Sequence, residues 1–422
     1  MPKFQTPRGT RDFLPEKMTR RQSVLDTLRS VFEKWGYEPL ETPAFEDWAL
    51  LSAKQGGGEE IKKEIFYFKD KGGRELGLRF DLTIPLARVI ANNPQLPKPF
   101  KRYAIGRVWR YDEPQAGRYR EFWQADVDIV GSPESEADAE IMAVACEALL
   151  VLGFEQFEVR VSDRRILDSF VKSLGVKEPV KVFRAIDKLE KAGEEQVRSE
   201  LRKAGLGAGQ VTEIMRFIAV KSMEQLRSLV SSDEMREALA ELDSVLAAMK
   251  GYGYSTYVRA DMSLVRGLEY YTGPVFEIKV GAGRLSIGGG GRYDGLIQLL
   301  GGKATPATGI SFGVERLVDI MEAEKMLELP KTKTSVFVAG AGDVRPAVLK
   351  AAKELRRAGI SCEYDVMQRD LGKQLQYVNA KGVPYALIIG EKEAKEGIYR
   401  LRNMKTGEEK LLKTVEEIAQ MI

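Results

Sequence analysis

Residues 101–131 read KRYAIGRVWRYDEPQAGRYREFWQADVDIVG, a pattern that predicts an antiparallel hairpin with a polar turn at 112–117. Because side chains alternate along a strand, one face of the second strand would carry the apolar residues Trp123, Ala125, Val127 and Ile129. The other face would carry Arg120, Phe122, Gln124, Asp126 and Asp128. A half-exposed strand would show the same alternation, but a cation, a flat ring, an amide and two carboxylates on one face favour a ligand site.

Two further segments repeat this combination of polar groups. In LRFDLT (78–83), strand alternation predicts that Arg79, Asp81 and Thr83 point one way, while Leu78, Phe80 and Leu82 point the other. In ATGISFGVERL (307–317), a strand of small residues is followed by a helix with Arg316 in its first turn. Both segments are candidates for the same site.

Two glycine-rich segments stand out as well. LVRGLEYYTG (264–273) sets Arg266 beside Tyr270, Tyr271 and two glycines. The glycines at 288–291 form a run that is unfavourable in an ordinary strand. The run is equally compatible with a bulged hairpin and with backbone that approaches a ligand closely.

The composition is that of a globular protein. At about 150 residues per domain, the 422 residues correspond to roughly three domains. Lys and Arg total 65 against 62 for Asp and Glu, a net charge of +3 that does not by itself indicate nucleic-acid binding. The N-terminus lacks the apolar segment of a secretory signal, and no stretch is long enough to span a bilayer. A cytoplasmic protein with no membrane contact is therefore expected.

Histidine is absent from the chain. Its absence excludes Ser-His and Cys-His nucleophiles, the HExxH zinc helix and any imidazole base. Cys146 and Cys362 lie far apart and in no CxxC pattern, so no metal site made by the protein alone is expected. Histidine is also the only side chain whose usual pKa lies between about 5 and 8. Any activity change with pH in that window is therefore expected to come from a substrate.

Periodicity divides the chain into parts. Helical spacing predicts a helix at 18–35, and residues 37–130 are mostly of period two. Residues 163–250 are rich in Leu, Glu, Lys and Arg without clear strands, which predicts an inserted helical module. We expect an α+β chain with a core at 1–162 and 251–329, a helical insertion at 163–250 and an independent α/β domain at 330–422.

Taken together, these segments resemble the histidyl-tRNA synthetase family of class II aminoacyl-tRNA synthetases over essentially the whole chain. ETPAFE around Pro43 resembles motif 1 of that class, and the hairpin with Arg110 and Arg118 resembles motif 2. GVERL with Arg316 resembles motif 3, while LVRGLEYYTG and GGGRYDGL resemble two signatures peculiar to the histidine enzymes. The resemblance implies an antiparallel-sheet catalytic core and a C-terminal α/β anticodon-binding domain.

The resemblance also implies an activity and its residues. L-histidine would be activated with ATP and Mg²⁺ to histidyl-adenylate and transferred to the 3′ end of tRNA(His), by a homodimer with motif 1 at its interface. The ATP-binding residues would be Arg110, Asp112, Arg118, Phe122 and Arg316. The histidine-binding residues would be Asp81, Thr83, Gln124, Asp128, Arg266, Tyr270 and Tyr271. Arg110 and Arg266 would be the catalytic pair, stabilising charge at the attacked phosphorus.

Two positions depart from the commoner bacterial pattern. Asp81 and Asp128 stand where that pattern has glutamates, which is closer to the archaeal and eukaryotic branch. Because aspartate is shorter, it stays open whether Asp128 contacts the imidazole directly or through water.

Two other functions share parts of this pattern. Regulatory paralogues that activate the first enzyme of histidine biosynthesis typically lack the anticodon-binding domain and the motif 2 arginines, and this chain keeps both. The glycine or threonine synthetases have a similar tail domain, but LVRGLEYYTG argues against them. In the tail, Arg369, Lys373 and Gln376 are candidate RNA contacts, although a solvated helix face would look the same.

Overall fold

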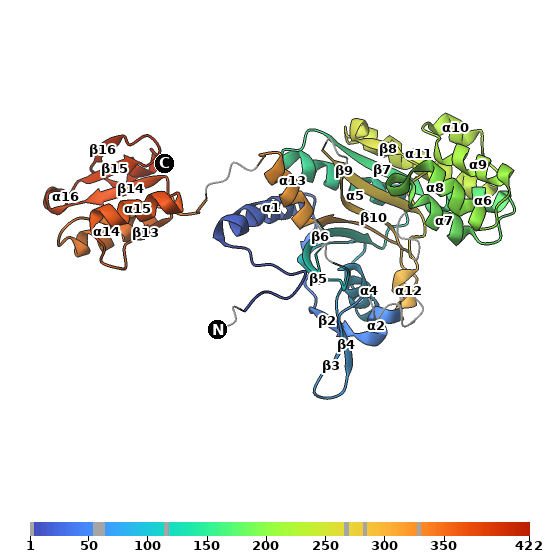
Figure 1. Ribbon diagram of the computed structural model, residues 1–422, viewed down its shortest axis with the longest axis horizontal. Helices are drawn as coiled ribbons and strands as arrows, with labels where there is room; N and C mark the ends of the chain where they lie inside the picture. The colour runs from blue at the N-terminus through green and yellow to red at the C-terminus, as the bar shows by residue number, and fades with distance from the viewer. Residues whose placement is uncertain are drawn as a thin grey trace. The chain divides into compact units, whose positions relative to one another are not determined.

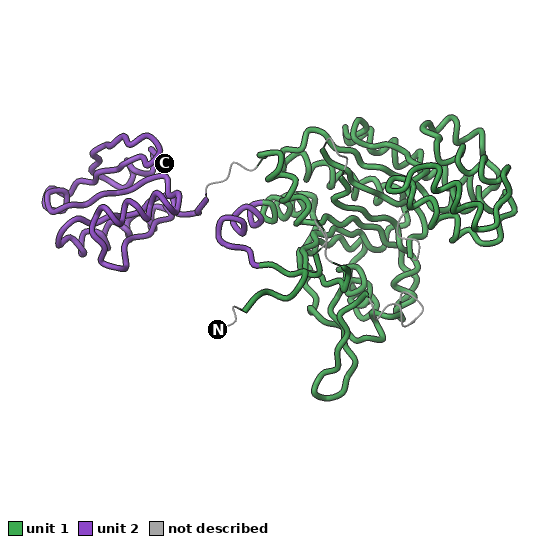
Figure 2. The backbone as a smooth tube through the Cα atoms, viewed as in Figure 1, with its two compact units in different colours: residues 1–11, 24–326 green, residues 12–23, 327–422 purple. Residues whose placement is uncertain are grey.

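The computed structural model describes residues 4–53, 64–113, 117, 119–265, 270–281, 285–326 and 331–422. The chain divides into two compact units, residues 1–11 with 24–326 and residues 12–23 with 327–422 (Figure 2). Helix α1 (Pro15–Lys34) therefore contributes residues to both units. Each unit has its own sheet and its own buried apolar residues.

An eight-stranded sheet organises the first unit (Figure 1). Its strand order is β1-β5-β6-β11-β10-β9-β7-β8, and the strands from β5 to β7 pair antiparallel. The outer strands β1 and β8 pair parallel with their neighbours. The strands are β1 (Glu38–Pro39), β5 (Phe100–Trp109), β6 (Glu121–Val130), β7 (Phe157–Asp163), β8 (Val258–Ala260), β9 (Pro274–Val280), β10 (Leu285–Arg292) and β11 (Ala307–Gly313).

Helices cover one face of this sheet. α5 (Ser135–Val151) packs on β6, β7 and β11, and α11 (Asp233–Gly251) packs on α5. Phe32 of α1 stacks on Phe312 of β11 with ring centroids 6.4 Å apart. Because adjacent strand residues point to opposite faces, Ser311 points away from α1. α13 (Val314–Ala323) continues directly from β11.

A three-stranded antiparallel sheet and short helices complete the core. The small sheet has the order β2-β4-β3, formed by β2 (Phe45–Asp47), β3 (Tyr67–Lys69) and β4 (Glu75–Leu78). The helices are α2 (Trp48–Ala53), α4 (Thr83–Asn92), α12 (Leu296–Leu299) and the 3-10 turn η1 (Ser255–Tyr257). Leu51, Ile84 and Leu296 from α2, α4 and α12 belong to one buried apolar cluster, which fixes the position of α4.

The stretch 164–251 is wholly described and forms helices without a strand, as its composition predicts. Its helices before α11 are α6 (Arg164–Ser173), α7 (Pro179–Ile186), α8 (Leu189–Lys203), α9 (Ala208–Ile218) and α10 (Met223–Arg227). Glu190 of α8 forms ion pairs with Lys279 of β9 and Arg160 of β7. These pairs attach the helical stretch to the large sheet.

The second unit contains a five-stranded mixed sheet of order β13-β12-β14-β15-β16. Its strands are β12 (Val336–Gly340), β13 (Cys362–Tyr364), β14 (Tyr385–Ile389), β15 (Tyr399–Asn403) and β16 (Glu409–Leu412). Its helices are α14 (Arg345–Arg357), α15 (Leu371–Lys381), α16 (Glu391–Glu396) and α17 (Val415–Ala419). Val336 and Val338 join one apolar cluster and Phe337 another, so both faces of β12 are buried, as is usual for parallel strands.

The predicted fold class is confirmed: an antiparallel sheet core with a helical insertion, followed by an α/β unit. The prediction of mostly strand over 37–130 is wrong, because that range contains α2 and α4. The glycine run forms the interior strand β10 with a register shift between Ser286 and Gly288, so the bulge is present. None of the helices in the described part of the chain has the length and apolar character needed to cross a membrane.

Candidate active site

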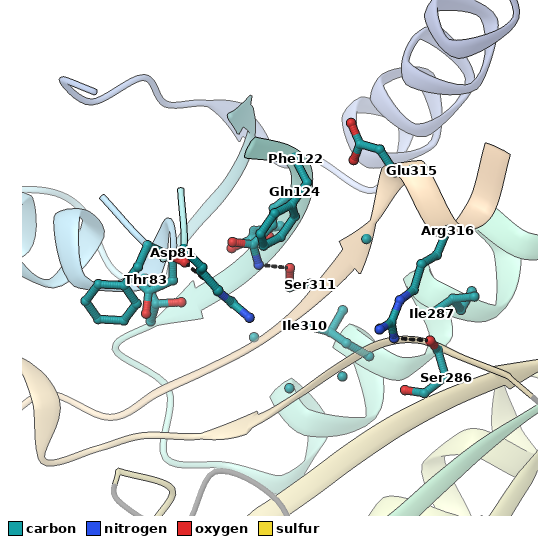
Figure 3. Close-up of a pocket in the computed structure, with 18 of the residues that line it drawn as sticks. Asp81, Thr83, Phe122, Gln124, Ser286, Ile287, Ile310, Ser311, Glu315 and Arg316 are labelled. Carbon is teal, nitrogen blue, oxygen red and sulfur yellow. Dashed lines mark hydrogen bonds between the residues drawn. The ribbon is translucent and has the colours of Figure 1, made fainter. Parts of the chain in front are cut away.

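A cavity of about 890 Å³ opens on the sheet face that carries Ser311. Its walls come from β6, β10 and β11, from the start of α4 and from residues 270–271, which are far apart in the sequence. Figure 3 shows Asp81 and Thr83 on one side of this space and Arg316 beside Ser286 on the other. The volume suits a small-molecule site.

One wall consists of Phe122, Gln124, Asp126 and Asp128 of β6. Gln124 Nε2 donates a hydrogen bond across the sheet to Ser311 Oγ at 2.6 Å (Figure 3), and the Ser311 hydroxyl hydrogen-bonds Asp126. Gln124, Asp126 and Asp128 are 8%, 2% and 3% exposed. The polar face of the strand is therefore buried around a cavity, and the alternative of a half-exposed strand is wrong.

Asp128 is held by two buried partners. Its Oδ1 accepts a hydrogen bond from the Tyr293 hydroxyl. Its Oδ2 lies 2.8 Å from Arg102 Nη2, in an ion pair whose angle is not that of a hydrogen bond. Arg102 is 1% exposed and faces Asp128 directly across the β5–β6 pair. A Cβ on Gly309 would lie 2.0 Å from Asp128 Oδ1, so glycine is required there to make room for the carboxylate.

Asp81 and Thr83 enter the cavity from a turn before α4. Asp81 Oδ1 accepts the N–H of Ile84 at 2.9 Å, which satisfies one of the free N–H groups at the start of a helix. β4 ends at Leu78, so the segment that follows is not a continued strand. The geometry therefore comes from a helix cap.

The predicted alternation over 78–83 is consequently wrong in part. Phe80 lines the cavity together with Asp81 and Thr83. Arg79 instead donates from Nη1 to the Thr42 carbonyl at 2.6 Å and is buried away from the cavity-lining residues.

Two arginines and an aromatic ring also line the cavity. The Arg110 guanidinium lies 5.1 Å from the centroid of the Phe122 ring, and its Nε donates to the Phe80 carbonyl at 3.1 Å. Arg316, in the first turn of α13, donates from Nη1 to the Ser286 carbonyl at 2.8 Å (Figure 3). These contacts fix two cations and one flat ring around the same space.

The two tyrosines of the glycine-rich segment complete the wall. Tyr270 and Tyr271 line the cavity, and the Tyr270 hydroxyl donates to that of Tyr271 at 3.1 Å. Burial raises the pKa of Tyr270 well above its usual value, so the phenol stays neutral and remains a hydrogen-bond donor. Gly288 and Gly290 of β10 face the same space, so backbone does approach the cavity there.

The cavity brings together every predicted site residue that the structure describes: Asp81, Thr83, Arg110, Asp112, Phe122, Gln124, Asp128, Tyr270, Tyr271 and Arg316. The predictions for Arg118 and Arg266 lie outside the described residues.

Several residues were not assigned from the sequence. Asp126, Ser311, Glu315 and Lys191 line the cavity, and Arg102 supports it from behind Asp128. Arg102 could have been identified from the sequence, because a hairpin closed at 112–117 places Arg102 opposite Asp128. Lys191 could not have been, since it belongs to the helical stretch, in α8.

Burial and repulsion change the acid chemistry of the cavity. Desolvation raises the pKa of Asp126 to about 7, and the charges of Asp128 and Asp81 add to the shift while Arg102 opposes it. Desolvation also raises the pKa of Asp128. A buried carboxyl therefore has a pKa in the range usual for histidine, so Asp126 is a protein group that could add to a substrate's pH dependence in this window.

This shift predicts a pH-dependent stability. The carboxyl of Asp126 has a pKa of about 7 in the folded chain against a usual 3.8, so the folded state binds this proton more tightly than the unfolded state. Its stabilising contribution is complete below pH 3.8 and is lost as the pH rises through about 7. We expect thermal unfolding midpoints of wild type to fall relative to those of Asp126→Asn between about pH 4 and about pH 7. A difference that does not change with pH would contradict the assignment.

The candidate RNA contacts of the second unit lie at α15. Lys373 and Gln376 are exposed, and Lys373 is ion-paired with Asp370 at 3.2 Å. Arg369 is held by Asp365 at 2.6 Å and lies 4.5 Å from the centroid of the Tyr377 ring. Arg369 therefore has a structural role in its own unit, whereas the other two present polar groups on the surface.

Comparisons with known proteins agree with this geometry. A model of the histidyl-tRNA synthetase family matches residues 9–317, and an anticodon-binding domain model matches residues 331–422. A histidine–tRNA ligase from Aeropyrum pernix is 44% identical over 415 residues, covering 95% of this chain and 94% of its own. One from Pyrococcus horikoshii is 39% identical over 412 residues, covering 95% of both chains.

A solved structure agrees as well. The crystal structure of histidyl-tRNA synthetase from Nostoc sp. PCC 7120 is 31% identical and matches over 100% of both chains with a TM-score of 0.89. With the family model, the full-length archaeal relatives and this fold in agreement, the chain belongs to the histidyl-tRNA synthetase family of class II aminoacyl-tRNA synthetases.

Proposed function

We propose that this chain is a histidine–tRNA ligase, which activates L-histidine with ATP and transfers it to the 3′ end of tRNA(His). The observation that carries the proposal is one cavity lined by two sets of groups, which we assign to two ends. The first set is Arg110, Arg316 and the Phe122 ring, and the second is buried carboxylates beside two tyrosines. The first set of groups suits a nucleoside triphosphate, and the second set suits an amino acid with positively charged or N–H donor groups.

At the nucleotide end, Phe122 would stack on adenine and Arg110 would contact the α-phosphate. Arg316 and Arg118 would hold the outer phosphates, and Asp112 would complete this end. Guanidinium groups suit this task because their planar donors match phosphate oxygens. The short distance between Arg110 and the Phe122 ring supports this assignment, because a cation beside the stacking ring is close to the phosphates of a stacked nucleotide.

Mg²⁺ is the metal that we propose to accompany ATP. It usually binds through one or two protein carboxylates together with phosphate oxygens, and Asp112 and Glu315 line the cavity with Arg316. This donor set fits the ion. When bound, Mg²⁺ would neutralise phosphate charge.

At the amino-acid end, Asp81, Thr83 and Gln124 would hold the α-amino and carboxylate groups. Gln124 Oε1 is buried and has no hydrogen-bond partner among the described residues, so it can accept from an α-ammonium group. Asp128, Tyr270 and Tyr271 would form the imidazole end, with Tyr293 and Arg102 holding Asp128 in place.

The chemistry requires no protein base. The histidine carboxylate is ionised at neutral pH, so one of its oxygens can bond to the α-phosphorus while pyrophosphate leaves with the electrons of the broken P–O bond. The protein contributes alignment of the two reactants and stabilisation of the developing charge. Arg110 and Arg266 would supply that stabilisation, and this explains how a chain without histidine can perform the reaction.

The remaining parts would bind tRNA. We propose the boundaries 1–162 and 251–329 for the catalytic core, 163–250 for the helical insertion and 330–422 for the anticodon-binding domain. The insertion would lie against the acceptor arm, and Lys191 supports this because it brings a cation from α8 to the cavity. Such an enzyme would work in the cytoplasm.

Amino-acid-dependent pyrophosphate exchange tests this function. The purified chain is assayed with ATP and each of the twenty amino acids in turn, followed by charging of tRNA. We expect exchange with histidine alone and transfer to tRNA(His). Exchange with glycine or threonine would favour another class II enzyme, and no exchange with any amino acid would favour the regulatory paralogue.

We also propose a homodimer with isologous contacts around Pro43. Phe45 and Phe68 are 51% and 38% exposed and meet edge to face, which leaves an apolar pair on the surface close to that segment. Light scattering at micromolar concentration should give twice the chain mass. An active monomer under the same conditions would overturn the proposal.

A further inference from the structure

Asp126 is a buried carboxylate in the cavity to which the family resemblance assigns no task. It lines the cavity between Gln124 and Asp128, is 2% exposed and accepts a hydrogen bond from Ser311. Its Oδ1 is buried and has no hydrogen-bond partner among the described residues. A buried acceptor without a partner is unfavourable, so a ligand that supplies a donor there would gain affinity.

Asp128 is less able than Asp126 to accept a hydrogen bond from a ligand. Both oxygens of Asp128 already lie against protein groups, Oδ1 against the Tyr293 hydroxyl and Oδ2 against Arg102. The Arg102 charge is thus held at Asp128, two residues along the strand from Asp126. Oδ2 of Asp128 has no hydrogen bond but faces the Arg102 cation, whereas Asp126 has no ion pair among the described residues, so Oδ1 of Asp126 is the acceptor open to a ligand.

The charges around Asp126 also support contact with a ligand that donates a hydrogen bond. Asp81, Asp126 and Asp128 interact with one another electrostatically, and Arg102 is the cation that opposes their charge at Asp126. Burial raises the pKa of Asp126 to about 7. This carboxyl can therefore hold a proton in the free protein and become an anion beside a ligand nitrogen that carries one.

We propose that Asp126 accepts the imidazole N–H of the bound histidine directly, and that Asp128, held by Arg102 and Tyr293, shapes the imidazole end as a positioning residue. Asp126 is thereby the specificity-determining carboxylate of the amino-acid end. The order along β6 supports this assignment, because Asp126 follows Gln124 and is farther from Phe122 and the nucleotide end. The inference rests on the proposed activation of histidine.

A histidine analogue without the ring N–H tests the contact. The thiazolyl analogue keeps the amino-acid backbone and a five-membered ring but has no ring N–H. Pyrophosphate exchange is measured with both amino acids for wild type, Asp126→Ala and Asp126→Asn. Wild type should discriminate by about 10⁴-fold in kcat/KM, the scale for a site whose buried acceptor would be left unpaired.

We expect Asp126→Ala to lower kcat/KM for histidine by at least about 100-fold and to leave the analogue nearly unchanged, so that discrimination collapses. Asp126→Asn keeps an acceptor oxygen and the side-chain volume, and should lose less of the discrimination. The KM for ATP should not change in either variant.

A matched control is Asp138→Asn. Asp138 is also a buried carboxylate with a raised pKa, about 6, but it is paired with Arg292 at 2.5 Å and does not line the cavity. Its substitution should leave the discrimination between histidine and the analogue unchanged, whatever its effect on stability.

The outcomes separate cleanly. If the Asp126 variants lose both amino acids equally, Asp126 serves the α-amino group or the fold and the inference is wrong. If discrimination persists in folded Asp126→Asn and Asp126→Ala, the inference is also wrong. Wild-type protein without histidine-dependent exchange would instead refute the proposed function itself.

Discussion

Replacement of Arg110 by alanine is expected to lower histidine-dependent pyrophosphate exchange by at least about 100-fold, the scale for losing a preorganised charge contact in a transition state. Arg110 lines the cavity next to the Phe122 ring, and its Nε is anchored by the Phe80 carbonyl. The guanidinium is therefore fixed before ATP binds. Because the charge it would contact develops at the α-phosphorus, kcat should fall more than the KM for ATP rises.

Arg107→Ala is the matched control. Arg107 lies three residues earlier on β5, is half-exposed, pairs with Glu121 at 3.8 Å and is not among the cavity-lining residues. Its loss should leave exchange within a factor of two or so of wild type, since exposed ion pairs contribute little. Arg110→Lys should recover only part of the rate, because an ammonium group cannot reproduce the planar donors. Near-normal exchange in folded Arg110→Ala would remove Arg110 from the reaction.

The hairpin at 101–131 was predictable because two local signals agree. The turn at 112–117 fixes the register, and strand alternation fixes the faces. Phe122, Gln124 and Asp128 consequently lie together in the cavity as the alternation predicts. The same register places Arg102 opposite Asp128, so the supporting arginine was also within reach of the sequence.

Asp81 shows where strand alternation fails. Asp81 does point toward the other candidate residues, but not because of strand alternation. LRFDLT is the end of a strand, then a turn, then the cap of a helix. Thr83 and the apolar residues after it look like a strand, yet they form α4, whose face packs into the cluster with Leu51 and Leu296. Tertiary burial outweighs local propensity there. Pro85 in the first turn was the available signal for a helix.

The pKa values in the cavity depend on how deeply each side chain is buried, which cannot be predicted from the local sequence. Asp126 and Arg120 lie on the same predicted face, but Asp126 is 2% exposed and its pKa rises to about 7. Only the packing of β6 between β5 and β11 determines that depth. The same packing also buries Arg102, which is the counterion of the buried acids of the cavity. Replacement of Arg102 is therefore the second change for which we expect a large effect.

Arg102→Met is expected to lower the free energy of unfolding by about 3–5 kcal/mol, the cost of leaving a buried charge without its partner. Arg102 and Asp128 have side chains that are 1% and 4% exposed, with 2.8 Å between the charged groups. Methionine fills much of the same volume, so the loss is mainly that of charge. Urea unfolding of the variant and of wild type, in the same buffer, measures it.

Three comparisons assign the effect to the uncompensated charge. Arg107→Met changes the exposed arginine of the same strand and should cost at most about 1 kcal/mol. Arg102→Met combined with Asp128→Asn should be more stable than Arg102→Met alone, because the second change removes the orphaned carboxylate. Acidification should also reduce the deficit of Arg102→Met, since the pKa of Asp128 is already raised by burial and rises further without the arginine. If Arg102→Met were as stable as Arg107→Met, the buried pair would not hold this site together, and Asp128 would have to be positioned by Tyr293 alone.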